Sequence, residues 1–383
     1  MSSHHSLPEK IKIFFIKCSN KEYWSSTLLY LPVMPYLVWL MIKSRAVFFF
    51  NAANPGIKNG GLLMESKWDM YLDAPAHFFP LTYYASPKEN FVFTTTRAWQ
   101  EFIFPVVAKP AIGSRGIGVA IIHNVEELEA YHLQVPVPYI VQQKITYPME
   151  AGIFYIRVPG ETKGMITGIV QKEFVQVTGN GKDNVFTLLK KNQRYLLQIH
   201  DLQKMIAPAM MQHIVPDGET ILLVDIGNHA RGAYFINATD KITAMLTSTV
   251  DFYCKQYPDF YFGRLDIRFN SWAELEQGLH FAIIEVNGSG SEPTHIYDPA
   301  NSIWYIWKEI CRHWKWMYLI SRQLHRQQNI PYQSTREGID LLLENSAYQK
   351  KVAGFVFTPA QPKQTAATFT AGFPLYQQKE QRN

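Results

Sequence analysis

The sequence contains few cysteines and little net charge, and these shortages exclude several classes of protein. Its three cysteines, Cys18, Cys254 and Cys311, lie far apart in 383 residues and form no CxxC pair. Neither a disulfide framework nor a zinc site is therefore expected, and a reducing compartment is favoured. The net charge of +5 is small and scattered along the chain, which argues against a nucleic-acid partner.

Apolar runs long enough to span a membrane are also missing. Residues 28–42 are uncharged and mostly apolar but include Pro32 and Pro35, whereas a spanning helix needs about 20 residues and proline breaks or kinks it. Two interpretations stay open. The segment could lie on a membrane surface, with Lys43 and Arg45 at the headgroups. A helix packed on another lobe is favoured, because the segment has no clean polar face.

The N-terminal sequence MSSHHSLPEKIKIFF lacks the order of basic, apolar and small residues that defines a signal peptide. A cytoplasmic location is expected, with association with a membrane left open. At this length the chain can bury a large core divided into two or three lobes.

Two apolar segments, residues 262–269 and 279–286, flank a polar turn and predict a strand–turn–strand unit. Alternation along the strands places polar side chains together on one face: Arg264, Asp266 and Arg268 on the first strand, Glu285 and Asn287 on the second. A register symmetric about the turn sets Asp266 opposite Glu285. It also sets Arg264 opposite Asn287.

Two carboxylates that face each other across strands destabilise a sheet unless a cation lies between them. Carboxylate and amide oxygens are ligands that suit magnesium held jointly with substrate phosphates. The sequence therefore predicts a metal site at Asp266, Glu285 and Asn287. A solvated face of mixed charge is disfavoured, because these residues interrupt apolar strands and a loop rich in Gly, Ser and Pro follows at once.

Residues 106–122, VVAKPAIGSRGIGVAII, predict a strand, a glycine-rich loop and a second strand. This is neither a Walker A loop nor a dinucleotide fingerprint, since both of those open a helix. Backbone N–H groups of the loop at Gly113, Gly116 and Gly118 could bind phosphate oxygens. Lys109, Ser114 and Arg115 would add charge and hydrogen-bond donors. The alternative is a flexible hairpin tip.

Three other segments leave alternatives open. Lys172 lies on a predicted strand face and is either an edge residue or a ligand-binding cation. The loop at residues 51–67 could bring Gly60, Gly61 and Lys67 to a ligand or could be an ordinary connection. Residues 303–317 have helical spacing and basic neighbours, so they form either a membrane or partner helix or a terminal helix packed on the core.

The order of these motifs resembles the ATP-grasp superfamily. FGRLDIRF and IIEVNGSGSEPTH are similar to the D-alanine–D-alanine ligase branch, and VTGNGKDNV and PDGETILLVDIGNHARGAYF are similar to the central part of cyanophycin synthetases. The resemblance implies an α+β fold of two lobes that clasp ATP, a flap lobe at about 88–142 and a metal-binding lobe at about 143–300. Outside it lie a divergent N-terminal region, 1–87, a helical extension, 301–358, and a tail from 359 whose composition predicts disorder.

Carried over residue by residue, the resemblance implies a nucleotide site. Lys109 and Lys172 would contact phosphates, and the flap of Gly113, Ser114, Arg115, Gly116 and Gly118 would close over them. Gln142, Gln143 and Ile145 would frame adenine, although glutamines replace the usual acidic hinge residue. Glu150 would hold ribose.

The resemblance implies a reaction site beside the nucleotide. Asp266, Glu285 and Asn287 would bind two magnesium ions. Arg264 would contact an acyl phosphate and the oxyanion that follows. Arg231, Ser291 and His295 would line the pocket of the second substrate.

The expected activity is ATP- and magnesium-dependent ligation of a carboxylate to an amine or thiol through an acyl phosphate. The partners would be small or peptide-like acids and amines. Two alternatives remain, a small-molecule kinase on the same core and a non-enzymatic, membrane-associated nucleotide-binding protein. The sequence does not predict the oligomeric state.

Overall fold

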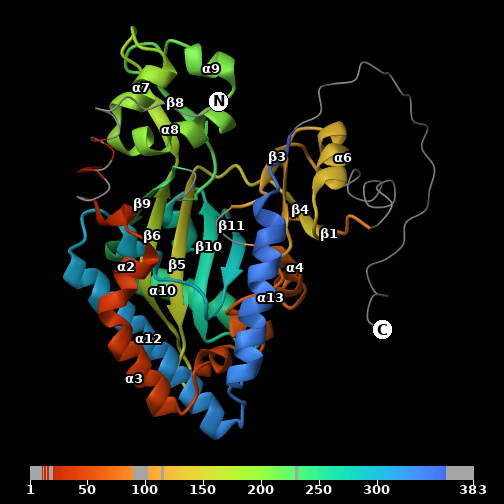
Figure 1. Ribbon diagram of the computed structural model, residues 1–383, viewed down its shortest axis with the longest axis vertical. Helices are drawn as coiled ribbons and strands as arrows, with labels where there is room; N and C mark the ends of the chain where they lie inside the picture. Colours follow the sequence, from red (N-terminus) through yellow and green to blue (C-terminus); the bar gives the residue numbers. More distant parts are fainter. Residues whose placement is uncertain are drawn as a thin grey trace.

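A computed structural model describes residues 11, 13, 15–16, 20–88, 102–113, 116–228 and 232–358. The strands in these ranges are β1 Thr82–Ala85, β2 Val106–Pro110, β3 Ala120–Ile122, β4 Tyr139–Gln143, β5 Met149–Ile156, β6 Met165–Glu173, β7 Val175–Thr178, β8 Thr220–Val224, β9 Tyr234–Asn237, β10 Phe262–Phe269 and β11 Phe281–Asn287. They form three antiparallel sheets, of four, five and two strands (Figure 1).

The α-helices are α2 Ser26–Tyr30, α3 Met34–Ser44, α4 Lys67–Leu72, α6 Val125–Gln134, α7 Val185–Lys191, α8 Gln193–Met205, α9 Pro208–Gln212, α10 Ala244–Lys255, α11 Trp272–Glu276, α12 Ile303–Gln327 and α13 Thr335–Ala353. Short 3₁₀ helices are η1 Lys21–Tyr23, η2 Leu31–Val33, η3 Phe49–Ala53, η4 Lys58–Gly61, η5 Ala76–Phe78, η7 Thr239–Lys241 and η8 Thr294–Tyr297. The α+β, two-lobed architecture that the sequence predicts is confirmed.

The flap lobe is the four-stranded sheet β1-β4-β2-β3. Its core packs Tyr131 of α6 against Tyr139 of β4, with both rings buried. The side chain of Asn124 caps α6 by accepting a hydrogen bond from Glu127 N. The first strand, β1, pairs with β4 and so extends this lobe upstream of the boundary predicted at residue 88.

The central lobe is the five-stranded sheet β11-β10-β5-β6-β9, whose alternating side chains fill two cores. On one face Ile153 and Tyr155 pack with Val250 of α10. On the other face Phe154 packs with Met317 of α12. Both faces of this sheet are therefore covered by helices.

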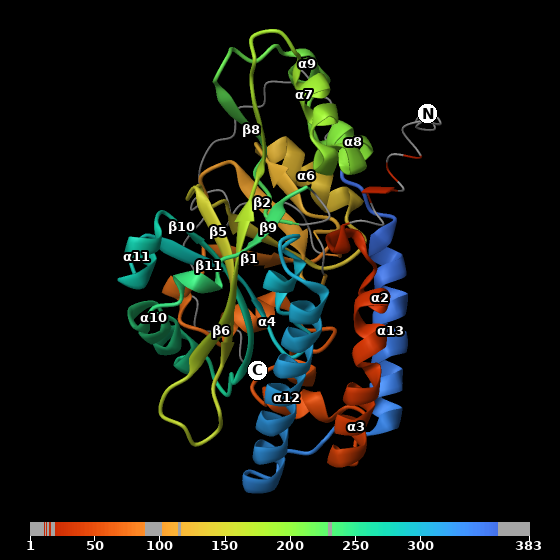
Figure 2. The same cartoon turned by 90° about the vertical axis from the view of Figure 1, so that its left-hand side faces the viewer.

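A small third unit separates β6 from β9 in the chain. Strands β7 and β8 pair, and helices α7, α8 and α9 pack on them around Val177, Leu189 and Leu202 (Figure 2). These three helices occupy most of residues 185–212.

The helical extension joins both lobes. Helix α12 packs on the central sheet and on η3, so the prediction of a terminal helix packed on the core is confirmed. Helix α13 begins with a capping box at Ser334 and Glu337 and reaches the flap lobe (Figure 1). There Tyr348 Oη donates to Ile112 O over 2.8 Å, and Phe355 packs against Tyr131.

Helices α2 and α3 lie against α12 (Figure 2). Among the described residues, one helical stretch, Ser26–Ser44, is long and apolar enough by composition to cross a membrane. One side of it is buried on α12, as the favoured interpretation expected, but its other side is exposed.

Candidate functional site

A cavity of about 1140 Å³ lies between the flap sheet and the central sheet. Its volume suits a nucleotide-sized ligand together with a second small molecule. Acidic side chains line it at Glu65, Glu150, Asp225, Asp266, Glu285 and Glu292, and basic ones at Lys67, Lys109, Lys144, Lys172, Arg264 and Arg268. Six cationic and six anionic groups therefore share one cavity, so its formal charge is balanced and an anionic ligand would have to be bound by particular cations rather than by a net positive charge.

The predicted register of the central strand pair is confirmed. Asp266 lies opposite Glu285, and Arg264 lies opposite Asn287. A bulge follows Asp266, and bulges re-aim side chains next to functional sites. All four side chains line the cavity.

Asp266 is buried and paired with two cations of the chain. Arg264 binds it in a bidentate manner, with Nε 2.9 Å from Oδ1 and Nη2 3.2 Å from Oδ2. Lys172 Nζ lies 3.4 Å from Oδ2. Burial raises the pKa of the Asp266 carboxyl, but Arg264 and Lys172 outweigh it and hold that pKa below its ordinary value.

Glu150 joins a second set of charges. Its Oε1 accepts from Lys172 over 2.8 Å, and its Oε2 accepts from Arg268 over 2.8 Å. Arg268 also binds Asp225 over 2.6 Å. Because both oxygens of Glu150 are engaged, it acts here as the link between Lys172 and Arg268, and its predicted role in holding ribose stays a prediction.

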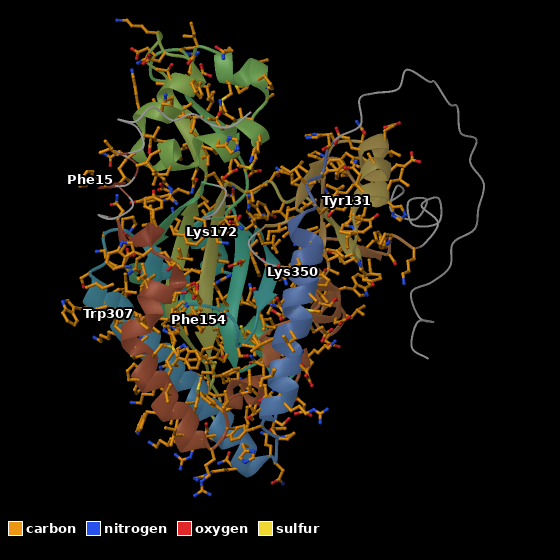
Figure 3. The ribbon with its side chains drawn as sticks, viewed as in Figure 1. Phe15, Tyr131, Phe154, Lys172, Trp307 and Lys350 are labelled. Carbon is orange, nitrogen blue, oxygen red and sulfur yellow. The ribbon has the colours of Figure 1, made fainter. Side chains whose placement is uncertain are left out.

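Lys172 Nζ lies 2.8 Å from Glu150 and 3.4 Å from Asp266, and Figure 3 labels this lysine on the central sheet. Burial lowers the pKa of its ammonium, but the charges of Asp266 and Glu150 outweigh burial and raise that pKa above its ordinary value. Lys172 is therefore a permanent cation of the cavity and the ligand-binding interpretation is favoured over an edge lysine.

Lys109 faces the same cavity from the flap sheet. Its Nζ donates to Gln142 Oε1 over 2.9 Å and to Ile284 O over 3.2 Å. Burial lowers the pKa of this ammonium, although Glu285 opposes the shift. With a hydrogen bond to Ile284 of β11, Lys109 connects the flap sheet to the central sheet.

The glycine-rich loop closes one side of the cavity. Gly113 and Gly116 line it, and Gly118 has a φ of +71°, with Pro110 Cγ 2.9 Å from where a Cβ would lie. Strands β2 and β3 pair on either side of the loop, so the strand–loop–strand prediction is confirmed. The predicted phosphate contacts of Ser114 and Arg115 lie outside the described residues.

Three residues of the predicted adenine hinge line the cavity: Gln142, Gln143 and Ile145. Gln142 is buried, and its Nε2 donates to Thr82 Oγ1 over 3.0 Å. Gln143 exchanges two hydrogen bonds with the backbone of Ile103, at 2.9 and 2.7 Å. The side chains of both glutamines are therefore held by the flap lobe itself.

The loop at residues 51–67 contributes Lys67 to the site. Lys67 Nζ lies 3.3 Å from Glu285 and donates to Gly113 O over 2.6 Å, so it links β11 to the glycine-rich loop. Gly61 has a φ of +71°, and its Cβ position lies 2.6 Å from Gly288 Cα. The glycines of this loop therefore allow its backbone to pack closely against the Gly288–Gly290 backbone. The sequence had suggested instead that they allow the backbone to approach a ligand.

The residues predicted to bind the second substrate do not lie together in the structure. Ser291 lines the cavity, and its Oγ donates to Gly288 O over 2.6 Å. His295 does not line it, and that prediction is wrong: the ring is buried beneath β6, 3.3 Å from Glu309 of α12. Arg231 lies outside the described residues.

Several lining residues were not identified from the sequence. They come from the N-terminal region, from α13 and from the loop before η8: Trp24, Ser25, Ser26, Leu62, Leu63, Met64, Asn345, Gln349, Glu292 and Tyr297. Glu292 accepts from Tyr297 Oη over 2.7 Å. The N-terminal and α13 positions carry no local motif, because long-range packing alone brings them to the cavity, whereas Glu292 belongs to the IIEVNGSGSEPTH segment.

The donor set at the strand pair suits an oxygen-seeking cation. No group of three or more His, Cys, Asp or Glu side chains able to hold a metal occurs in the part of the chain that the structure describes, but Asp266, Glu285 and Asn287 supply two carboxylates and an amide. Asn287 Nδ2 is buried without a hydrogen-bond partner, so rotation of the amide could present its oxygen instead. The residues therefore fit magnesium shared with a phosphate ligand.

Comparisons with known proteins give matches only among solved structures. No family model and no curated protein matches the sequence. A bifunctional glutathione synthetase from Pasteurella multocida aligns with a TM-score of 0.36 and 13% identity, over 68% of this chain and 38% of that one. D-alanine–D-alanine ligases from Bacillus anthracis and Coxiella burnetii align with TM-scores of 0.38 and 0.39, at 12% and 11% identity, over 69% and 76% of this chain and 68% and 64% of theirs.

This chain thus spans under two fifths of the glutathione synthetase and about two thirds of each ligase. These structures include the ligase branch that the sequence motifs resemble.

Proposed function

We propose that the chain is an ATP-dependent ligase that joins a carboxylate to an amine through an acyl phosphate. The observation that carries the proposal is the in-register strand pair, in which Arg264, Asp266, Glu285 and Asn287 face one cavity with Lys109 and Lys172. A structural ion-pair network would not need a cavity of about 1140 Å³ beside it.

The cations are arranged to receive phosphate groups. Lys109 enters from the flap sheet and Lys172 from the central sheet, so a polyphosphate between them would be neutralised from both sides. The Lys172 side chain is buried and that of Lys109 is half-buried, and in such a site electrostatic stabilisation is stronger than in water. ATP would be held with its phosphates between these lysines and beneath the glycine-rich loop.

Asp266, Glu285 and Asn287 are the residues that would hold magnesium. When bound, magnesium would neutralise charge on the transferred phosphoryl group and orient it. In this structure Arg264 and Lys172 neutralise Asp266, so the chain's own cations keep the opposed carboxylates from repelling each other.

Arg264 is placed to act on the second half of the reaction. Its Nη1 donates to Glu292 O over 3.2 Å, which aims the guanidinium between the metal-binding strands and the loop that carries Ser291. Attack of an amine on an acyl phosphate places negative charge on the former carbonyl oxygen, and a fixed guanidinium stabilises that charge. Arg264 would thus bind the acid first and the oxyanion afterwards.

The test uses hydroxylamine as a general amine. The full chain is incubated with ATP, magnesium and a panel of small and peptide-like acids, and hydroxamate and ADP are measured. An acyl phosphate reacts with hydroxylamine to give a hydroxamate, so the ligase proposal predicts hydroxamate and ADP in equal amounts with at least one acid.

A matched pair of variants separates the site from contamination. Lys172→Met should abolish hydroxamate formation, whereas Lys204→Met, on the exposed surface of α8, should leave it unchanged. ADP formed with an alcohol, without any hydroxamate, would replace the ligase by a small-molecule kinase on the same site.

A further inference from the structure

Helices α2 and α3 present a continuous apolar surface to solvent. We call it the α2–α3 face, and it consists of Leu28, Leu31, Met34, Val38, Trp39 and Ile42, with exposed fractions of 56, 63, 39, 43, 48 and 70%. Soluble proteins rarely leave such a surface uncovered unless it is an interaction site.

The opposite side of Ser26–Ser44 is packed in the core of the protein. Leu29, Val33, Leu37 and Leu40 are buried, and the first two pack with Ile306 and Ile310 of α12. A helix that is apolar all round is normally buried all round. Here only one side has a partner within the described residues.

Charge around the α2–α3 face is of one sign. No acidic residue occurs between residues 23 and 64, while Lys43 lies in the last turn of α3 and Arg45 caps its C-terminus. On the neighbouring helix α12, Lys308 and Lys315 are exposed. The single acidic residue of α12, Glu309, is buried and paired with Arg312. The surroundings of this apolar face are therefore cationic.

Tryptophan and lysine occur together at both ends of this region. Lys43 Nζ lies 4.4 Å from the ring centroid of Trp39. Trp304 is 74% exposed and precedes Lys308 by one helical turn. Trp307, labelled in Figure 3, donates to Leu29 O over 3.1 Å and so fixes the start of α12 beside α2. Indole rings next to basic groups are typical of the interface between lipid headgroups and acyl chains.

We propose that the α2–α3 face binds the surface of an anionic lipid bilayer, with its apolar side chains among the upper acyl chains. Lys43, Arg45 and Lys308 would contact the headgroups. The segment would lie in the interface and would not span the membrane, because spanning would remove Leu29 and Leu37 from the core.

A second copy of the chain is a poorer occupant. A two-fold interface pairs the same patch with itself, so Lys43 and Arg45 of one copy would lie near those of the other with no acidic residue on the face to offset them. Anionic headgroups supply the charge that a second copy lacks.

The test is flotation of the full chain with vesicles of phosphatidylcholine alone and of phosphatidylcholine with phosphatidylserine. We expect binding to the anionic vesicles, weakened by salt. Ile42→Glu and Trp39→Ala should each reduce binding by tenfold or more. Lys43→Ala should reduce it roughly fivefold, the effect of one basic side chain at an anionic surface.

Leu343→Glu is the matched control, because Leu343 is 64% exposed on α13, away from this face. It should bind vesicles as the wild type does. All variants should keep the wild-type melting temperature and the wild-type thermal shift with ATP, which separates this proposal from the proposed function.

Absence of wild-type binding to anionic vesicles would overturn the proposal, as would an equal loss with Leu343→Glu. Sedimentation, which measures the oligomeric state, provides a second test. A wild-type dimer that Ile42→Glu converts to a monomer, without vesicle binding, would assign the face to a second copy.

Discussion

The two carboxylates of the strand pair should respond differently to loss of charge. Asp266→Asn and Glu285→Gln each remove one negative charge and keep nearly the same shape. Asp266 is 4% exposed and lies within 3.4 Å of both Arg264 and Lys172. The Glu285 side chain is 29% exposed and meets Lys67 at 3.3 Å.

The magnitudes follow from these contacts. Asp266→Asn leaves two buried cations with less compensation, and breaking a buried pair costs about 3–5 kcal/mol. Part of each hydrogen bond survives in the amide, so we expect a loss of about 3 kcal/mol in the free energy of unfolding. Glu285→Gln removes a partly solvated pair, which is worth about 1 kcal/mol or less.

The effect on turnover should be alike for both variants. Each should lower magnesium-dependent ADP release in the hydroxylamine assay by at least about a hundredfold, because metal-centred charge stabilisation supplies several kcal/mol. Urea denaturation and ADP release are measured on the same preparations. Equal stability losses would refute the buried-pair reasoning, and wild-type turnover in both variants would refute the metal assignment.

Protonation of Asp266 in acid should destabilise the protein, as its replacement by Asn does. Its folded pKa lies below the ordinary value, so its stabilising charge is fully present above the unfolded pKa of about 3.9 and is lost as the pH falls through the folded pKa. The stability difference between wild type and Asp266→Asn should therefore shrink as the pH is lowered below about 4.

Three further predictions concern other parts of the fold. Burial lowers the pKa of His313 to about 3, so between pH 6.5, about its ordinary pKa, and pH 3 only the unfolded chain binds a proton at this residue. The contribution of His313 to the free energy of unfolding should therefore fall by about 2 kcal/mol from pH 7 to pH 5. Urea denaturation of His313→Asn should lack that part of the loss. Gly61→Ala should destabilise the protein by at least about 2 kcal/mol, because a φ of +71° is strained for alanine and the added Cβ would lie 2.6 Å from Gly288 Cα. Gly354→Ala is the control, because the added Cβ would meet no atom within 4 Å; this variant should have a melting temperature within about a degree of the wild type. Lys109→Met should weaken ATP binding at least tenfold in a titration, because it removes the cation that the flap sheet contributes to the proposed phosphate site; unchanged affinity would place the phosphates elsewhere.

The parts of the site that alternate along one strand could be predicted from the sequence. The period of two along residues 262–287 and one short turn fix both the face and the register, and the structure has Asp266 opposite Glu285 as expected. The glycine-rich hairpin is similarly local, since β2, the loop and β3 are contiguous.

The parts of the site that depend on partners far away in the sequence could not be predicted from it. Glu150 pairs with Arg268, 118 residues later, and no spacing rule connects them. His295 follows a motif that suggested a substrate pocket, yet it packs beneath β6 beside Glu309 of the following helix. Strand β1 and helix α13 join the flap lobe through pairing and packing with β4 and Tyr131, contacts that no local pattern encodes.

The central claim is that the cavity between the two sheets binds ATP with magnesium. Isothermal titration of the full chain with ATP, in the presence and absence of magnesium, tests it most directly. The predicted result is saturable binding at one site that magnesium strengthens in the wild type and no longer strengthens in Glu285→Gln. Absence of ATP binding, or an equal magnesium effect in Glu285→Gln, would contradict it.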